Sequence, residues 1–329
     1  MLKKSFLLCA ACSTLLNMSG CAGSAKASTE TDNMSDSLPV VYYIKDITPE
    51  NIIKIYEALG RKAEGKNVAV KISTGESEKS HQLDPDLIKD FVNKVNGTLV
   101  ECNTAYEGSR NTTEKHLKTV EEHGYTKIAK VDIMDADGDT ILPVNGGMHL
   151  DRNYVGSHFL DYDFLVVLSH FKGHAMGGFG GALKNVAIGI ASSNGKAWIH
   201  SGGKTNDASE IWDNIAEQDV FLESMADACK GVFDHMGDRM LFINIANNLS
   251  VDCDCDANAA PPVMGDLGIL ASLDPVALDR ASVDMVMHTN EPGKEELLER
   301  INSRHGTHTL EAAEKLGLGS QKYTLITIE

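Results

Sequence analysis

Short runs of β-branched residues alternate along this chain with segments whose apolar residues recur at helical spacing. Runs at 40–44 and 68–72, for example, flank such a segment at 49–59. This alternation predicts an α/β fold with a mixed or mostly parallel sheet, or sheets, flanked by helices. The run 164–168 is almost wholly apolar, which is typical of a strand that is buried on both faces.

The remaining elements are expected to continue this order. We predict further helices over 85–95, 113–123, 209–236, 275–287, 294–301 and 310–316, and further strands over 98–102, 240–245, 267–271 and 323–328. With 329 residues and 42% hydrophobic content, the chain can build a large core. We therefore expect an α/β domain over 39–329, either undivided or in two lobes with 250–329 contributing to the second.

The first 38 residues predict export. Two lysines precede a short apolar run, and the small pair Ser19 and Gly20 precedes Cys21, as in a bacterial lipoprotein signal over 1–20. The alternative is an ordinary secretory peptide with an incidental cysteine. Residues 21–38 are small and polar, which is typical of a flexible tether. We expect an extracytoplasmic lipoprotein anchored in the membrane through lipidated Cys21.

The net charge of the chain and its predicted export each exclude a class of ligand. Lys and Arg number 30 against 47 Asp and Glu, a net charge of -17, which would repel a nucleic-acid backbone. Nucleic-acid partners are therefore not expected. A free metal ion can bind after the unfolded chain has crossed the membrane, whereas a cofactor assembled in the cytoplasm cannot travel with it.

Glycine is dense after the apolar run 164–168. Seven glycines lie between 173 and 195, and the sequence matches neither the phosphate-loop nor the dinucleotide-binding pattern. Open α/β sheets bind ligands where strands end, and glycine lets backbone N–H groups approach a ligand. We therefore predict a substrate site at Gly177, Gly178, Gly180 and Gly181; the alternative is a packing turn.

Three histidines and a lysine accompany the glycines: His170, His174, Lys184 and His200. A single histidine is more often structural than functional, but their convergence on one loop favours a site. Lys184 can serve as an anion clamp, as a Schiff-base amine or as a surface charge, and we favour the anion clamp for a small anionic substrate. A free histidine would then move a proton.

Cys253 and Cys255 are separated by one residue within an aspartate-rich stretch. In an extended chain their side chains point the same way, so two thiolates can meet one soft metal ion such as Zn, Ni or Fe. One or more of His170, His174 and His200 would complete the ligand set, with His170 and His200 favoured. The alternatives are a redox disulfide or two unrelated thiols. Ala257 and Val263 occupy positions where a calcium loop needs glycine and a carboxylate, which disfavours calcium.

A third candidate stretch follows the strand expected at 98–102. Tyr106, Ser109 and Arg110 lie between that strand and the next helix and can bind substrate at the strand end. The alternative is a capped helix start with Arg110 in solvent.

The segments 103–116, 170–191, 253–255 and 266–279 together resemble the prokaryotic domain-of-unknown-function family 362 over most of residues 39–328. Members are often described as iron–sulfur-centre proteins, so the resemblance implies an iron–sulfur cluster as a cofactor. This chain has no C-x2-C-x2-C-x3-C run.

A histidine, a Gly-Gly loop, a lysine and a later histidine also occur in the order seen in nickel-pincer lactate racemases. This distant resemblance implies a two-lobed architecture in which His174 is an acid/base, Lys184 the cofactor-bearing lysine and His200 the metal ligand.

These observations predict a metal-dependent enzyme or redox protein, with or without a redox partner, that acts on a small anionic substrate. The alternative is a non-catalytic lipoprotein that binds a metal or another ligand. The catalytic candidates are His174 and Lys184.

Overall fold

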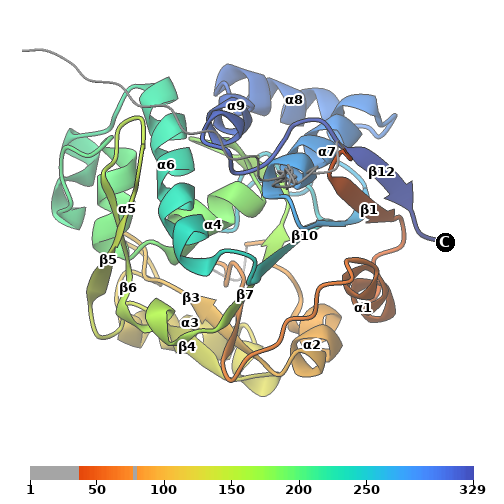
Figure 1. The fold of residues 1–329 in the computed structure, drawn as a ribbon, viewed down its shortest axis with the longest axis horizontal. Helices are drawn as coiled ribbons and strands as arrows, with labels where there is room; N and C mark the ends of the chain where they lie inside the picture. Colours follow the sequence, from red (N-terminus) through yellow and green to blue (C-terminus); the bar gives the residue numbers. More distant parts are fainter. Residues whose placement is uncertain (1–36, 77–79) are drawn as a thin grey trace, which may run out of the picture. The chain divides into compact units, whose positions relative to one another are not determined.

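Eight strands form one sheet in the order β12-β1-β11-β10-β7-β2-β3-β4 (Figure 1). The computed structural model describes residues 37–76 and 80–329. The strands are β1 (Val40–Ile44), β2 (Val68–Lys71), β3 (Gly97–Glu101), β4 (Val131–Ile133), β7 (Phe164–His170), β10 (Met240–Ala246), β11 (Gly268–Ser272) and β12 (Thr324–Thr327). Strand β11 runs antiparallel to β1 and β10, and the other neighbouring pairs are parallel. The expected α/β fold with a mostly parallel sheet is confirmed.

Strand β7 lies at the centre of the sheet, and all seven of its residues are buried. Val166 pairs with Val70 of β2 on one side and with Leu241 of β10 on the other, and these three side chains join one hydrophobic core. Leu165 and Val167 point to the opposite face and join a second core. This alternation explains why the sequence shows a nearly continuous apolar run here.

Helices cover both faces of the sheet. One face packs against α1 (Pro49–Ala58), α2 (Pro85–Lys94) and α3 (Thr113–Glu122). The other carries α4 (Ala182–Ile190), α5 (Ser193–His200), α6 (Gln218–Met236), α7 (Pro275–His288), α8 (Lys294–Ser303) and α9 (His308–Lys315). No helix within the described residues is both long and apolar enough to cross a membrane.

Capping residues mark several of these helix starts in the sequence. Thr48 accepts the N–H of Asn51 at 3.2 Å ahead of α1, and Asp274 accepts that of Ala277 at 2.9 Å ahead of α7. A proline follows each cap at the first helical position. The caps satisfy N–H groups that the helix leaves unpaired, so these boundaries were predictable.

The helix expected over 209–236 is wrong in its first part. A short 3-10 helix, η3 (Ala208–Asp213), comes first, and α6 begins only at Gln218. Between them the N–H of Ala216 donates to the carbonyl oxygen of His200 at 2.9 Å, a tertiary bond that takes the chain out of helical register. Periodicity within the segment could not reveal that distant partner.

Two short hairpins went unpredicted. They pair β5 (Asp139–Pro143) with β6 (Arg152–Gly156) and β8 (Lys172–His174) with β9 (Gly178–Gly180). The second contains most of the glycine-rich run and leads directly into α4.

The chain from 250 onward forms no second lobe among the described residues. It supplies β11 and β12 to the main sheet, and Leu38–Glu329 forms one compact unit. The predicted signal over 1–20, the lipidation at Cys21 and nearly all of the tether over 21–38 lie outside the described residues.

Candidate functional site

A cavity of about 100 Å³ lies at the carboxyl ends of β2, β3 and β7. Lys71, Glu101 and His170 end these strands and contribute to its wall. The rest of the wall comes from the β8–β9 hairpin, from α4 and α5, and from the loops around 106 and 254. Space for a few water molecules suits a small ligand rather than a nucleotide. Besides those three, the wall includes Cys102, Tyr106, Arg110, Lys172, His174, Gly180, Gly181, Lys184, Lys196, His200, Cys253 and Cys255.

Two of the four glycines predicted to bind substrate line the cavity, and two do not. Gly180 and Gly181 line the cavity, whereas Gly177 and Gly178 are not part of its wall. The N–H of Gly177 donates to His174, and Gly178, at φ +79°, packs against the backbone of Gly306. Close backbone packing is thus the reason for glycine at 178.

The start of α4 is already occupied by a carboxylate of this chain. Asp279 of α7 accepts the N–H groups of Ala182 at 2.7 Å and Leu183 at 2.9 Å. A Cβ at Gly181 would lie 2.3 Å from Asp279 Oδ1, which explains the glycine there. These two N–H groups at the helix start are therefore unavailable to a substrate anion, and burial raises the pKa of Asp279 to about 6.

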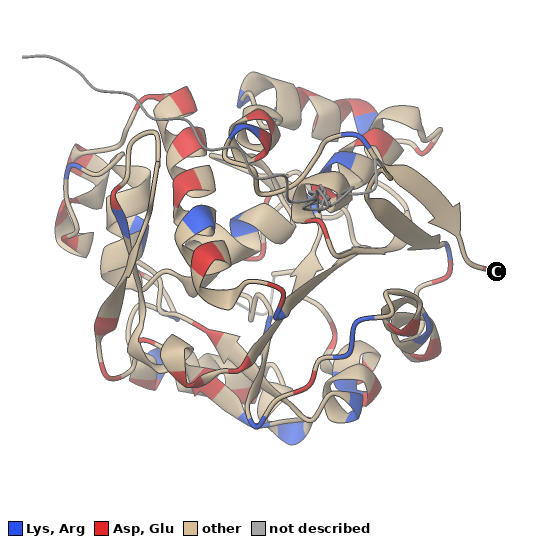
Figure 2. Ribbon diagram, in the orientation of Figure 1, with Lys and Arg blue, Asp and Glu red and all other residues tan. Residues whose placement is uncertain are grey.

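Five cationic side chains line the cavity, and three have carboxylate partners. Lys71 Nζ lies 2.6 Å from Glu101, Arg110 Nε lies 2.8 Å from Glu76, and Lys172 pairs with Asp254. Across the rest of the ribbon, Figure 2 shows acidic and basic residues mixed along the outer helices.

Lys184 and Lys196 are the two exceptions. Lys196 is buried, and within the part of the chain that the structure describes its amine donates only to the carbonyl oxygen of Ala191, at 2.7 Å. Lys184 is half-buried, and its amine has neither a hydrogen bond nor an ion pair to any residue that the structure describes. Burial, together with the charges of Lys172 and Lys71, lowers the pKa of Lys184 to about 7.

The three histidines differ in the hydrogen bonds that their ring nitrogens make. His170 faces an acceptor from each ring nitrogen, Asp254 Oδ1 at 2.9 Å and the carbonyl oxygen of Asn247 at 2.6 Å. Both nitrogens therefore face an oxygen acceptor of this chain. Neither nitrogen is free for the metal-ligand role predicted from the sequence.

His174 is held in the opposite way. Its Nδ1 accepts the backbone N–H groups of Met176 at 3.2 Å and Gly177 at 2.8 Å, so the ring proton resides on Nε2. Burial, with the charge of Lys184, lowers the pKa of His174 well below its usual value and keeps the ring neutral. His174 thus offers a donor, not a base.

His200 presents a free lone pair. Its Nδ1 donates to the carbonyl oxygen of Lys196 at 2.7 Å, which leaves Nε2 unprotonated. Burial lowers its pKa to about 4, so the ring is neutral at pH 7, and it stacks on Phe221 at 4.8 Å between ring centroids. Of the three, His200 has the hydrogen-bond pattern typical of a metal-binding histidine.

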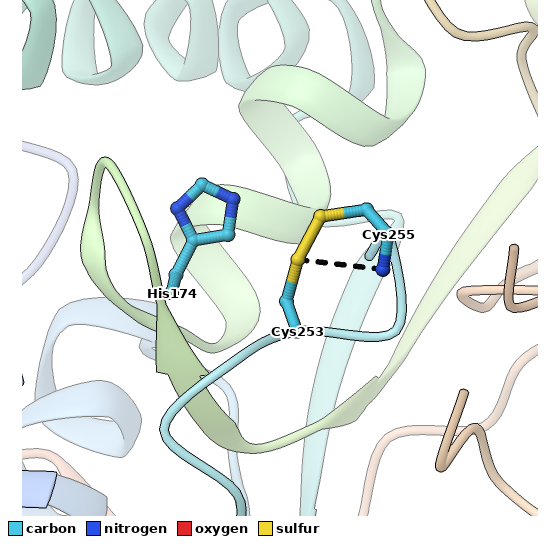
Figure 3. A group of neighbouring side chains, drawn as sticks. All are labelled: His174, Cys253 and Cys255. Atoms are coloured by element: carbon cyan, nitrogen blue, oxygen red, sulfur yellow. Dashed lines mark hydrogen bonds between the residues drawn. A yellow bond between two sulfur atoms is a disulfide. The ribbon is translucent and has the colours of Figure 1, made fainter. Parts of the chain in front are cut away.

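Cys253 and Cys255 are joined by a disulfide in the cavity wall, with their Cα atoms 5.2 Å apart. Figure 3 shows the ring of His174 directed at this disulfide, and one ring nitrogen and the two sulfurs lie within 4.8 Å of one another. A metal site needs such proximity, and of the three candidate histidines His174 is the one grouped with the two sulfurs. The sulfurs must be reduced before they can bind a metal.

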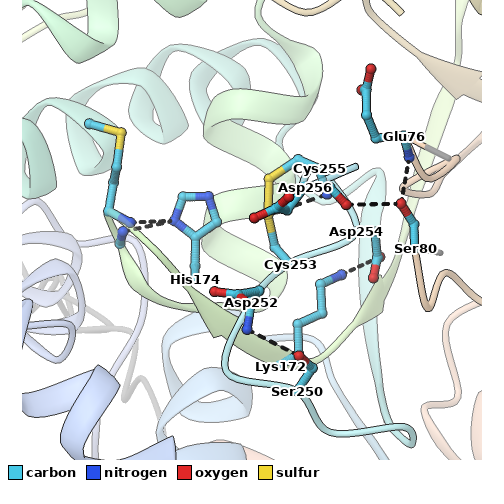
Figure 4. Close-up of a disulfide and its surroundings, with 12 residues drawn as sticks. Glu76, Ser80, Lys172, His174, Ser250, Asp252, Cys253, Asp254, Cys255 and Asp256 are labelled. Atoms are coloured by element: carbon cyan, nitrogen blue, oxygen red, sulfur yellow. Dashed lines mark hydrogen bonds and ion pairs between the residues drawn. A yellow bond between two sulfur atoms is a disulfide. The ribbon is translucent and has the colours of Figure 1, made fainter. Parts of the chain in front are cut away.

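The loop between the cysteines also anchors the cationic wall. Asp254 lies between Cys253 and Cys255 and pairs with Lys172 (Figure 4). It also accepts a hydrogen bond from His170 Nδ1 at 2.9 Å. Burial opposes its charge, but Lys172 and His170 keep the pKa of Asp254 well below its usual value. The disulfide is therefore fixed to the end of β7 and to β8.

In the third candidate stretch, two of the three residues predicted to bind substrate line the cavity. Tyr106 and Arg110 line the cavity, and Tyr106 donates to the carbonyl oxygen of Cys255 at 3.2 Å. Arg110 is buried against Glu76 rather than solvated. Ser109 bonds Glu76 and does not line the cavity.

Sequence reasoning missed Lys71, Glu101, Lys172, Lys196 and Asp279. Lys71 and Glu101 had a usable signal, because each is a charged residue ending an apolar strand, the position where α/β sheets bind ligands. Asp279 and Lys196 had no signal, because each looks like one more polar residue on a helix.

The chain matches the model of a known protein family. A family described as Domain of unknown function (DUF362) matches residues 68–284, which confirms the resemblance to family 362. Among curated proteins, none matches this chain.

Two solved structures are similar in fold. The lactate racemase apoprotein from Thermoanaerobacterium thermosaccharolyticum has 14% sequence identity and a TM-score of 0.43, covering 76% of this chain and 57% of its own. A structural-genomics protein from Thermotoga maritima has 15% identity and a TM-score of 0.38, covering 81% and 58%. This chain therefore spans less than two thirds of the length of either.

Proposed function

The chain belongs to the Domain of unknown function (DUF362) family, and we propose that it is an enzyme that exchanges a proton with a small anionic substrate. The supporting observation is that the amine of Lys184 has no partner among the described residues, in a cavity that Lys196 also lines. The other three cations of the wall have carboxylate partners.

The charge balance of the cavity supports an anionic ligand. A buried charge without a counter-ion is unfavourable, and a protein usually pairs or neutralises it. Among residues 37–76 and 80–329, no carboxylate pairs with Lys184 or Lys196, although acidic residues outnumber basic ones in the sequence by 47 to 30. A carboxylate or phosphate between the two ammonium groups would supply the missing charge.

The polar groups around the anion suit proton transfer. An amine with a pKa near 7 is present both as base and as acid at neutral pH, which is the condition for efficient acid–base catalysis. The Nε2–H of His174 can donate a hydrogen bond to a substrate oxygen, where negative charge would develop after the proton leaves. Lys184 in its neutral form is thus the proposed base, while the Lys196 ammonium retains the anion and His174 is the proposed oxygen-binding donor.

A metal ion is compatible with this proposal only when the two cysteines are reduced. In the disulfide state neither sulfur is a thiolate, and His174 carries its proton on the nitrogen that faces the sulfurs. A soft ion such as zinc would therefore require reduction of Cys253 and Cys255. The proposed proton transfer uses only side chains of this protein.

The proposed setting is extracytoplasmic, with Cys21 lipidated and the domain tethered to the membrane. The charged, apolar and small-residue segments of the first 21 residues support this proposal. Globomycin treatment of cells should cause the uncleaved precursor to accumulate, and a Cys21→Ala variant should no longer accept labelled palmitate. Normal processing of both would contradict lipidation.

Solvent-deuterium exchange tests the enzyme directly. The full chain is incubated in D2O with a panel of 2-hydroxy acids, and loss of the α-hydrogen signal is followed by proton NMR. Lys184→Gln should slow exchange about 100-fold or more, whereas Lys89→Gln, on the exposed surface of α2, should not change it.

The alternative is a non-catalytic binding protein, and the same cavity would serve it. Tight binding of a panel member without exchange would favour this function over the enzyme. If the protein neither binds a panel member nor catalyses exchange, the proposal of a small-acid substrate is wrong.

A further inference from the structure

We propose that Cys253 and Cys255 form a redox-active pair that exchanges electrons with a small anionic thiol bound in the cavity. The inference rests on the proposed function only for the charge of the ligand. The pair itself is identified by its place in the wall and by the groups around its sulfurs.

The disulfide is placed to react rather than to stabilise the fold. It joins residues two positions apart, so it closes a very short loop and constrains the unfolded chain little. Both sulfurs belong to residues of the cavity wall, with Cys255 partly exposed and Cys253 only 5% exposed. A thiol in the cavity would therefore meet Cys255 first.

Cys253 is prepared to leave with the electron pair. Its Sγ accepts the backbone N–H of Cys255 at 3.3 Å, and the protonated side of the His174 ring is directed at the disulfide (Figures 3 and 4). The Cys255 N–H stabilises negative charge on Cys253 Sγ, and a His174 ring nitrogen lies within 4.8 Å of both sulfurs. Lys172 and Lys184 in the same wall add positive charge.

The proposed thiol–disulfide exchange has two steps. A substrate thiol gives its proton to the Lys184 amine, its sulfur bonds Cys255 Sγ, and the S–S bond breaks with the electron pair on Cys253. A second thiol then attacks the substrate sulfur of this mixed disulfide, which releases a substrate disulfide and leaves Cys255 with an electron pair. The two thiol protons end on the two cysteines, so two thiols are oxidised and one protein disulfide is reduced.

The pair can be tested with three small thiols of different charge. The full chain in its oxidised form is treated with mercaptoacetate, 2-mercaptoethanol or cysteamine, and its free thiols are counted over time by alkylation and mass spectrometry. Each rate is divided by that of the same thiol with cystine, which removes intrinsic reactivity. We expect the corrected rate to be at least tenfold higher for mercaptoacetate than for cysteamine.

Variants connect that preference to the site. Lys184→Gln should abolish the preference, whereas Lys89→Gln should retain it. His174→Phe, which lacks the donor, should slow reduction by all three thiols, and His174→Gln, which can donate from its amide, should recover part of the rate. Circular dichroism shows whether each variant is folded.

Two results would overturn the inference: equal corrected rates for the three thiols, or free thiols at 253 and 255 in protein equilibrated with oxidised glutathione. Calorimetry with inorganic phosphate separates the proposals. Phosphate binding that depends on Lys184, together with equal thiol rates, would remove the redox pair and leave the anion site. Absence of phosphate binding with a retained thiol preference would remove the proposed substrate site and leave the pair.

Discussion

Asp279 of α7 accepts the backbone N–H of Leu183 in the first turn of α4, at 2.9 Å. It also accepts from Asn244 of β10 at 2.8 Å, so one buried carboxylate ties a helix start, a second helix and the central sheet together. The arrangement fixes the helix that carries Lys184.

Asp279→Ala should lower the free energy of unfolding by about 2–4 kcal/mol, because it leaves buried N–H groups unpaired. The helix-cap variant Asp84→Ala, at an exposed site, should lower it by only about 1 kcal/mol. Urea unfolding followed by circular dichroism gives both values. Equal small losses would show that Asp279 does not anchor α4.

Anion binding should weaken as the pH rises through about 7. Protonated Lys184 attracts an anion and the neutral amine does not, and its pKa is lowered to about 7. Calorimetry with sulfate, whose charge is constant over this range, should show a falling affinity between pH 6 and 8. In Lys184→Gln the affinity should be lower and independent of pH across that interval; a pH dependence that survives would assign it to another group.

Glu101 should contribute stability that disappears in acid. Burial opposes its charge, but Lys71 and Arg110 lower its pKa from 4.5 to about 2. For a carboxyl group with a lowered folded pKa, the stabilisation is complete above the unfolded value and is lost as the pH falls from about 4.5 to 2. Glu101→Gln should flatten the stability profile in that window, measured by urea unfolding at successive pH values.

Breaking the Lys71–Glu101 pair should be more harmful than removing it. Glu101→Leu leaves the Lys71 ammonium buried and unpaired, and we expect a loss of about 3–5 kcal/mol. The double variant Lys71→Met with Glu101→Leu should recover a large part of this loss in a double-mutant cycle. Additive losses would mean that the two charges act independently.

Zinc binding should depend on the redox state of Cys253 and Cys255. The disulfide has no thiolate, so equilibrium dialysis with elemental analysis should find no zinc at this site in oxidised protein. Reduced protein should bind zinc, and Cys253→Ser should abolish that binding. The buried thiol Cys229, which contacts the Leu183 carbonyl, provides a matched control as Cys229→Ala. Equal zinc in both redox states would place the ion elsewhere.

The sheet and most helices were predictable from local pattern. Val166 and its neighbours in β7 form an apolar run because a central parallel strand is buried on both faces. Thr48 and Asp274 each precede a proline and mark helix starts. The β8–β9 hairpin could not be predicted, because three-residue strands have no readable period.

The sequence by itself determined the α/β class, the family, and the stretches around His174, Lys184 and Cys253 that reach one cavity. Only the tertiary structure decided what each group can do there. Whether a histidine nitrogen donates or accepts depends on partners far along the chain, as Asp254 is for His170. Asp279 likewise accepts the N–H groups at the start of α4 because the fold brings α7 to α4. Local sequence sets residue type and periodicity, whereas protonation and partners are set by long-range packing.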